Sequence, residues 1–294
     1  MNEDRLAALL SSLFKGGRDF IGIGDDAAVL PYKKGEKLLF TTDTIIEGRH
    51  FIKNRLSPYY IGRKAMAVNI SDIAAMGGEP LYAVVNLGIK KLDKVFVSKL
   101  YRGIKNIAEK YDIKIVGGDT VKSNSLFLAI AMVGKVKSIY LLTRSGAKVG
   151  DAIYVTGTIG GAASSSKHYK FNPRLKEAQW LSSNFKINSM IDITDGLILD
   201  LSRLCKASDK GAILDKRLIP LSARAASFSS AVREGEDFEL LFTASGKSNI
   251  PGSIPGCGLK VRSIGNITEK RGGILIQEAG RMRKVKVEGY DHFK

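Results

Sequence analysis

The chain has 294 residues, of which 44% are hydrophobic and 26% are charged, a balance typical of a globular protein long enough for two ordinary domains. Its formal net charge is +17, but the basic residues are scattered, and no basic stripe with interleaved aromatic residues stands out. This composition does not favour a disordered chain. No apolar run approaches the roughly 20 residues that span a bilayer, which excludes an integral membrane protein.

The cysteine content and the N-terminal segment do not suggest a secreted protein. Only Cys205 and Cys257 are present, without a CxxC pair, and Met1 to Phe14 forms a short amphipathic run that carries charges from its start. We therefore expect a cytoplasmic protein.

The first half of the chain is expected to alternate strands with helices. A short apolar run at 37–42 ends in two threonines before Asp43, which predicts a strand that ends there. Ser57-Pro58 predicts the start of a long helix that stops at Gly77-Gly78, with Asn69 and Asp72 on one face. The other elements expected are a strand at 80–89, a helix at 93–111, a buried strand at 113–116 that breaks at Gly117-Gly118-Asp119-Thr120, and a strand at 126–136.

A polar, glycine-bearing joint at 142–147 precedes a second half of the same style. We place an N-terminal domain at residues 1–138 and a C-terminal domain at 139–294. The second is expected to hold strands at 152–156, 190–192 and near 238–243, 259–264 and 273–277, a glycine-rich turn at 157–161, an unplaced helix and a helix at 196–208. This order predicts an α/β or α+β fold with two domains.

Aspartates in apolar, strand-like surroundings are the most informative residues. The chain has only 29 acidic residues against 46 basic ones, and an isolated buried carboxylate is costly unless it is paired, protonated or bound to metal. Asp72 lies in mid-helix, where aspartate is unfavourable, although any single aspartate could instead cap a turn. The series consists of Asp25 and Asp26, Asp43, Asp72, Asp119, and the pair Asp192 and Asp195. Because Mg²⁺ is usually held by carboxylates together with substrate phosphates, the series predicts a site for several Mg²⁺ ions.

Two glycine motifs imitate nucleotide-binding loops without fitting them. Gly22-Ile23-Gly24-Asp25-Asp26-Ala27 matches G-x-G-x-x-G/A, but its adjacent carboxylates would repel a pyrophosphate. Gly246-Lys247-Ser248 imitates the end of a P-loop, but Leu241 stands where the first glycine is required. A site that uses ATP would therefore hold phosphates through metal ions and scattered glycine N–H groups.

Nine segments, taken in order, resemble the thiamine-monophosphate kinase family, which belongs to an ATP-binding superfamily with aminoimidazole ribonucleotide synthetase. The segments are GIGDDAAVL (22–30), TTDTIIEGRHF (41–51), GRKAMAVNISDIAAMGGEP (62–80), YRGI (101–104), VGGDTVKS (116–123), TRSGAKVGDAIYVTG (143–157), DITDGL (192–197), GEDFELLFT (235–243) and GYDHF (289–293). The resemblance implies ATP-dependent phosphorylation of thiamine phosphate to thiamine diphosphate by direct, Mg-assisted transfer. It also implies two α/β domains and a homodimer in which the N-terminal sheets pair.

The same resemblance implies roles for single residues. Metal ligands would be Asp26, Thr41, Thr42, Asp43, Asp72, Asp119, Asp192 and Asp195; ATP contacts Tyr101, Gly118, Asp119, Arg144 and Thr194; substrate contacts His50, Glu236 and Tyr290. No general base is expected, because the second pKa of a phosphate monoester is about 6 and its oxygen is already ionised at pH 7. Arg144 is the candidate for stabilising charge on a phosphate. Arg49 and Glu234 depart from residues usual in the family, whereas Thr194 replaces the usual serine and keeps its hydroxyl.

Two other functions stay open at this point. One is an aminoimidazole ribonucleotide synthetase-like, ATP-dependent ligase, and the other is a basic nucleic-acid-binding protein, whose affinity would fall steeply with salt. Selenophosphate synthetase chemistry is disfavoured because no cysteine precedes Cys205, and a hydrogenase-maturation role because the chain ends Tyr290-Asp291-His292-Phe293-Lys294 without one.

Overall fold

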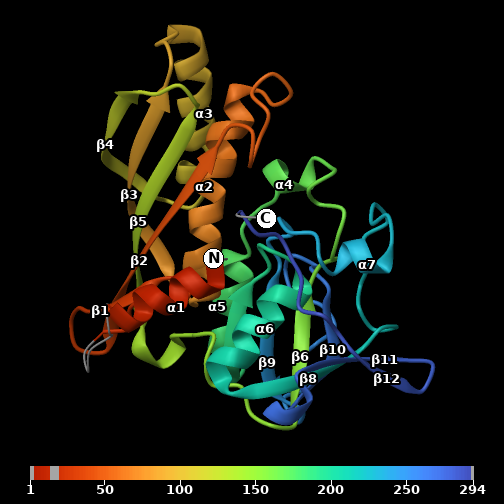
Figure 1. Cartoon of the computed structure of the whole chain (residues 1–294). Helices are drawn as coiled ribbons and strands as arrows, with labels where there is room; N and C mark the ends of the chain where they lie inside the picture. Colours follow the sequence, from red (N-terminus) through yellow and green to blue (C-terminus); the bar gives the residue numbers. More distant parts are fainter. Residues whose placement is uncertain (1–2, 14–19, 293–294) are drawn as a thin grey trace.

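A computed structural model of the chain describes residues 3–13 and 20–292, apart from the side chains of Glu3 and Arg271. Phe14 and Phe293, which belong to segments considered above, lie outside these ranges. Two mixed sheets, each with helices packed against it, confirm the expected α/β (α+β) class (Figure 1). No helix of the described residues is long and apolar enough to cross a membrane.

The first sheet comes from the N-terminal half. Its strands, in spatial order, are β1 (Ala28–Pro31), β2 (Glu36–Ile46), β5 (Phe127–Lys137), β3 (Glu79–Ile89) and β4 (Lys114–Lys122). Neighbours are antiparallel except β3 and β4, which are parallel because helix α3 (Lys94–Lys110) connects them. Helices α2 (Pro58–Ala75) and α3 lie side by side against this sheet, and α1 (Glu3–Leu13) lies near its lower end in Figure 1.

The second sheet comes from the C-terminal half. In spatial order it contains β12 (Arg281–Lys284), β11 (Ile274–Glu278), β8 (Lys210–Asp215), β10 (Val261–Glu269), β6 (Asp151–Thr156), β9 (Leu240–Ser245) and β7 (Ile187–Asp192). Its helices are α4 (Lys167–Lys170), α5 (Leu175–Asn184), α6 (Leu197–Ser208) and α7 (Phe228–Ala231), with 3₁₀ turns η1 (Ser138–Tyr140) and η2 (Lys270–Gly272). The turn η1 lies between the last strand of the first sheet and the first strand of the second, while the domain boundary itself stays a prediction.

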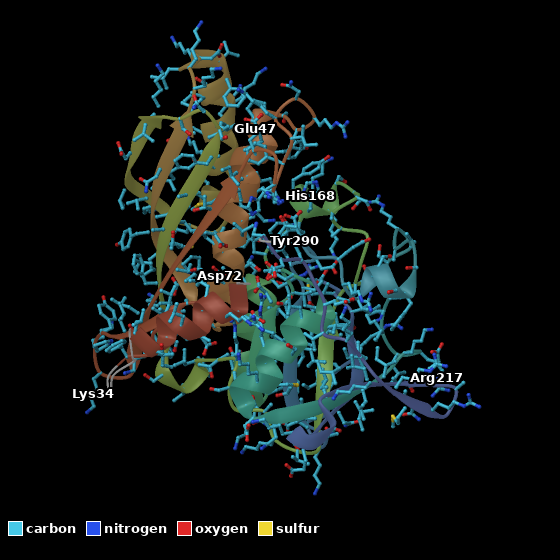
Figure 2. All side chains as sticks on the ribbon, in the orientation of Figure 1. Lys34, Glu47, Asp72, His168, Arg217 and Tyr290 are labelled. Atoms are coloured by element: carbon cyan, nitrogen blue, oxygen red, sulfur yellow. The ribbon has the colours of Figure 1, made fainter. Side chains whose placement is uncertain are left out.

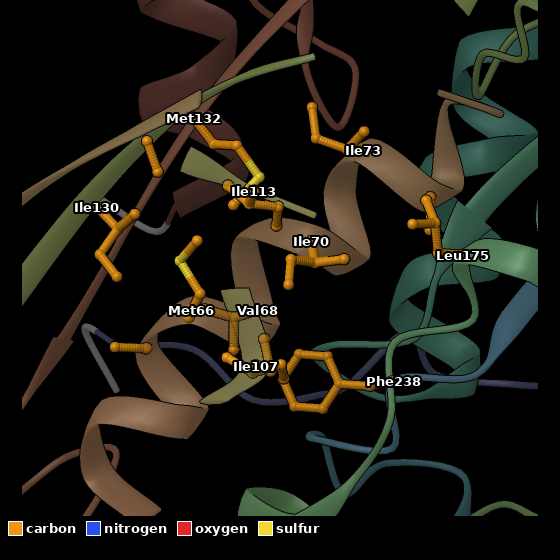
Figure 3. Close-up of a cluster of buried hydrophobic side chains, with 14 of the residues drawn as sticks. Met66, Val68, Ile70, Ile73, Ile107, Ile113, Ile130, Met132, Leu175 and Phe238 are labelled. Atoms are coloured by element: carbon orange, nitrogen blue, oxygen red, sulfur yellow. The ribbon is translucent and has the colours of Figure 1, made fainter. Parts of the chain in front are cut away.

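Helix α2 lies at the centre of the molecule and is buried along nearly its whole length. Its buried residues are not confined to one face, so the helix must be covered on more than one side. On one side Met66 belongs to a cluster with Ile130 and Met132 of the first sheet, and the same cluster takes in Leu175 and Phe238 of the C-terminal half (Figure 3). The helix is therefore held from both halves of the chain.

Two expectations about the strands were wrong. The strand expected to end before Asp43 continues to Ile46, because β2 keeps its register with β5 over its full length. The strand expected to be buried and to break at Gly117 instead runs through to Lys122 and is exposed throughout, because β4 is an edge strand. At Gly118, φ is +152° and an added Cβ would lie 1.9 Å from the Val85 carbonyl oxygen, so glycine is required there.

Short or strongly charged elements were not expected from the sequence. Strand β1 has four residues, and β12 carries three basic side chains in four positions. Strand β8 follows α6 with only Asp209 between them, in a left-handed conformation at φ 56°. Hydrophobic periodicity is weak over such short segments, so tertiary pairing decides them.

Candidate functional site

A cavity of about 1090 Å³ lies where the two halves of the chain meet. Its wall draws on α1, the turn at 23–26, strand β2, helices α2 and α6, and the segments at 192–195, 235–238 and 290–292. Figure 2 shows Asp72 and Tyr290 in this central region. The volume is at the upper end of the range usual for small-molecule sites.

Three carboxylates meet in this cavity from three separate segments. Asp26, Asp72 and Asp192 each present an oxygen, and these oxygens all lie within 4.8 Å of one another. The Thr41 hydroxyl donates to Asp72 Oδ2 at 2.5 Å, and the Ser71 hydroxyl donates to Asp192 Oδ2. Helix α2 thus joins strand β2 on one side, through Asp72, to the end of β7 on the other, through Ser71.

The electrostatics of this cluster call for a cation. Burial raises the pKa of Asp72 well above its usual range, and the charges of Asp43, Asp192 and Asp26 raise it further. The pKa of Asp43 rises to about 6, first through burial and then through Asp195 and Asp26. Among the described residues, Asp26 Oδ2 is a buried oxygen without a hydrogen-bond partner. Closely placed, buried oxygen donors of this kind fit a hard divalent cation such as Mg²⁺.

Two arginines partly neutralise the acidic groups. Arg144 donates to Asp26 Oδ1 through Nη2 at 2.5 Å and Nε at 3.2 Å. Arg203 donates through Nη1 to Asp195 Oδ2 at 2.5 Å and to Asp200 Oδ1 at 2.8 Å. Sequence reasoning missed Arg203, for which the only signal was its spacing of three residues from Asp200 on α6.

Asp200 fixes the backbone beside these groups. Its Oδ2 accepts hydrogen bonds from the N–H groups of Thr194 and Asp195, each at 3.0 Å. Both of those residues line the cavity, as expected. Burial raises the pKa of Asp200 to about 7, and Asp195 adds to the rise.

The end of the cavity away from the three clustered aspartates is lined by aromatic side chains. His50 Nδ1 accepts a hydrogen bond from the Ile46 N–H at 3.0 Å, so the proton of its neutral form is on Nε2. Burial, then the charges of His292 and Lys64, lower the pKa of His50 to about 4, and the ring is neutral at pH 7. The rings of His50 and His292 lie 4.9 Å apart, and those of Tyr290 and His292 4.8 Å apart.

Glu236 also lines the cavity, whereas the two nearby glutamates do not. Glu239 is buried and accepts from Arg174 at both oxygens, at 2.7 Å each. Glu234 accepts from the Gly161 N–H at 3.0 Å and so fixes the glycine-rich turn. Of these three glutamates only Glu236 is placed to meet a molecule in the cavity, and its role as a substrate contact stays a prediction. Arg49, the other unusual residue, is exposed and lines the cavity beside His50.

Three predicted ATP or metal residues do not line this cavity. Tyr101, Gly118 and Asp119 belong to α3 and β4, and strand register puts Gly118 in the same row as Asp43, three strands away. Three spacings of about 4.8 Å amount to roughly 14 Å. Asp119 therefore lies too far from Asp43 of its own chain to share one ion with it, and its role as a metal ligand stays a prediction. The other predicted residues, Thr41 and Thr42 among them, all line the cavity.

Comparisons with known proteins find the same family in both halves of the chain. The family model for the AIR synthase related protein N-terminal domain matches residues 24–136, and the model for its C-terminal domain matches residues 148–277. The chain is 33% identical to the thiamine-monophosphate kinase of Escherichia coli (strain K12), over 93% of this chain and 92% of that protein. It is 35% identical to that of Buchnera aphidicola subsp. Acyrthosiphon pisum, over 92% of each.

A solved structure, "AaThiL complexed with AMPPCP and TMP", superposes with a TM-score of 0.86 at 28% identity, covering 99% of this chain and 97% of that one. The similarity therefore extends over both sheets and the cavity between them. The chain belongs to the thiamine-monophosphate kinase family, within the AIR synthase related proteins.

Proposed function

We propose that this protein transfers the γ-phosphoryl group of ATP to thiamine phosphate, giving thiamine diphosphate and ADP. The observation that carries the proposal is a single cavity with an acidic, oxygen-rich end and an end lined by aromatic rings, among them the neutral His50. The first end suits metal-bound phosphates, and the second suits a flat heterocycle. The kinase relatives and the nucleotide-analogue and TMP complex of AaThiL support the same assignment.

The reaction needs no general base from the protein. An ionised oxygen of the acceptor phosphate forms the new bond to the γ-phosphorus, while the bond from that phosphorus to the β,γ-bridging oxygen breaks and ADP leaves. Asp26, Asp72 and Asp192 would hold Mg²⁺, with Thr41, Thr42, Asp43 and Asp195 completing the set. Bound there, Mg²⁺ would supply charge neutralisation for the phosphates. Arg144 would place its guanidinium fork against the transferred group.

At the other end, His50, Glu236 and Tyr290 would contact the thiamine moiety. The neutral His50 offers its Nε2–H as a donor, and the Glu236 carboxylate offers acceptor oxygens beside a cationic thiazolium. Tyr290, 38% exposed, offers a ring face at the cavity wall.

We further propose a homodimer in which the first sheet pairs with that of a second copy. The edge strand β4 exposes three apolar side chains, at 39% for Ile115, 60% for Val116 and 45% for Val121. An uncovered apolar edge strand is a template for pairing. Such pairing would place Tyr101, Gly118 and Asp119 at the site of the partner copy, which accounts for their distance from the cavity of their own chain.

Mixing inactive chains tests this arrangement. Asp72→Asn and Asp119→Asn chains are each expected to be inactive, and co-refolding them in equal amounts should restore about a quarter of the wild-type activity, because half the dimers would hold one intact site. Sedimentation should show a dimer. A monomer, or no recovery on mixing, would contradict the proposed pairing.

The function is tested by incubating the protein with γ-labelled ATP and thiamine phosphate, with Mg²⁺ or with excess chelator. We expect label in thiamine diphosphate only when Mg²⁺ is present. The matching AIR synthase related domains keep a ligase of that type as a second candidate, and it would release the label as free phosphate. Labelled phosphate without thiamine diphosphate would overturn the kinase assignment. A cytoplasmic location remains an expectation from the sequence.

A further inference from the structure

Lys64 is a fully buried lysine on α2 at the ring end of the cavity. Its Nζ donates to the His50 carbonyl oxygen at 2.9 Å and to Glu236 Oε1 at 2.5 Å. The same Nζ lies 3.2 Å from His168 Nδ1. A buried ammonium is costly unless it is paired, so this lysine depends on its partners. It also ties together two of the residues proposed to contact the substrate.

Glu236 is held in an unfavourable backbone conformation. Its φ is 67°, a left-handed value that is rare for a residue other than glycine, and its N–H donates to the Thr194 carbonyl oxygen at 2.6 Å. Lys64 binds one carboxylate oxygen, and His168 Nδ1 lies 3.1 Å from the other. Contacts on both oxygens restrict the carboxylate to one orientation, and each oxygen keeps capacity to accept a further hydrogen bond at the cavity that Glu236 lines.

The same contacts keep Glu236 ionised. Burial raises the pKa of Glu236, but the hydrogen bonds and charges of His168 and Lys64 together outweigh burial, and the pKa lies below its usual value. An ionised carboxylate beside neutral His50 favours a cationic or N–H-bearing heterocycle over an anionic one.

His168 reaches Glu236 because its segment is anchored on α2. Arg63, the neighbour of Lys64, donates to the Tyr169 carbonyl oxygen at 2.9 Å and to the Phe171 carbonyl oxygen at 2.6 Å. The two consecutive basic residues of α2 therefore fix the backbone and the histidine of one segment. His168 does not itself line the cavity, so it acts on the cavity only through Glu236 and Lys64.

We propose that Lys64 and His168 are positioning residues that hold the Glu236 carboxylate toward the heterocyclic, cationic end of the substrate and thereby set the affinity for thiamine phosphate. This proposal rests on the proposed function. It assigns to the pair no contact with ATP, whose phosphates would lie at the acidic end of the cavity.

The contact between His168 and Glu236 is made by Nδ1 of the histidine ring, and this determines which replacements can keep it. Because Nδ1 of His168 faces Glu236, asparagine can place its amide nitrogen near that position, whereas alanine removes the donor and glutamine places its amide near the position of Nε2. His168→Ala is expected to raise KM for thiamine phosphate roughly 10- to 100-fold, the loss expected for one hydrogen bond to a charged group. KM for ATP should stay unchanged, and His168→Asn should restore most of the affinity.

Lys167→Met is the matched control. Lys167 pairs with Asp237 at 3.2 Å and Glu239 at 3.3 Å, both buried and both outside the cavity wall. Losing this pairing should lower the unfolding temperature without changing either KM. Lys64→Met should raise KM for thiamine phosphate as His168→Ala does, provided that it folds.

Calorimetric titration of thiamine phosphate into the ATP-free protein gives a second readout. Weakened binding to His168→Ala with recovery in His168→Asn supports the proposal, and if the alanine variant does not fold, weakened binding to His168→Gln supports it. Wild-type affinity in His168→Ala or His168→Gln, or an equal rise in both KM values, overturns it. A wild-type protein that forms no thiamine diphosphate would refute the proposed function instead.

Discussion

Asparagine in place of Asp72 is expected to lower kcat by on the order of 10³ while raising the unfolding temperature of the metal-free protein. The loss follows from removing one of three clustered carboxylates, because metal-assisted charge stabilisation contributes several kcal/mol and each 1.36 kcal/mol is about tenfold in rate. The gain in stability follows because an amide removes a like charge and can still accept from Thr41.

The stability effect has a definite pH dependence. The folded protein binds protons more tightly than the unfolded chain, since the pKa of Asp43 is raised from 3.8 to about 6 and that of Asp72 is raised well above 3.8. Stability of the metal-free protein should therefore fall as pH rises from about 4 through 6 and above, and Asp72→Asn should flatten that fall. Thermal unfolding between pH 4 and 8, with and without Mg²⁺, measures it.

Asp151→Asn provides the control for Asp72→Asn. Asp151 is a buried aspartate outside the cavity wall, held by the Lys148 N–H at 2.8 Å and by Asn188. Its replacement should destabilise the protein and leave turnover and Mg²⁺ stabilisation intact. An Asp72→Asn protein that keeps wild-type turnover and is still stabilised by Mg²⁺ would contradict the metal assignment.

Replacing Arg144 by alanine is expected to lower kcat/KM for ATP by on the order of 10², a loss typical of removing one charge-stabilising donor in a preorganised site. Lysine should recover little of this, because it keeps the charge but not the planar fork that now engages Asp26 through Nε and Nη2. Steady-state kinetics at varied ATP and saturating thiamine phosphate provide the measurement.

Arg217→Lys is the matched control for Arg144. Arg217 also forks onto an aspartate, through Nε and Nη2 to Asp215, but it is exposed and lies at the edge of the molecule far from Asp72 in Figure 2. Its replacement should leave the kinetics unchanged. If Arg144→Lys were as active as wild type, a charge alone would suffice and the forked contact would be unnecessary.

The sequence predicted the parts of the fold that have strong periodic signals. Helix α2 and strands β3 and β5 appear within two residues of their expected bounds, because long apolar patterns with clear stops determine them. The mid-helix position of Asp72, where aspartate is unfavourable, predicted a metal site, and Asp72 does line the cavity. The predictions that failed were those based on short local patterns. In β4, for example, a glycine pair continues an edge strand instead of making a turn.

Contacts between residues that are far apart along the chain could not be predicted. Lys64 and Glu236 are 172 positions apart, and Lys64 and His168 are 104 apart, so neither pairing leaves a local pattern. A lysine next to an arginine at the start of a helix suggests a solvated face, whereas the fold buries it. The family resemblance assigns to one site Asp72 together with Tyr101, Gly118 and Asp119. Only the register of the sheet shows that, within one chain, strand β4 lies far from the cavity.

The central helix α2 carries Lys64 at the proposed heterocycle end of the cavity and Asp72 at the proposed phosphate end, eight positions apart. At 1.5 Å per residue the two Cα atoms are separated by about 12 Å along the axis. Since both halves of the chain pack against this helix, it cannot stretch or slide to suit a different molecule. Under the proposed function, the helix therefore sets how long a substrate must be: a heterocycle without the acceptor phosphate would bind near Glu236 and would not reach the acidic end of the cavity.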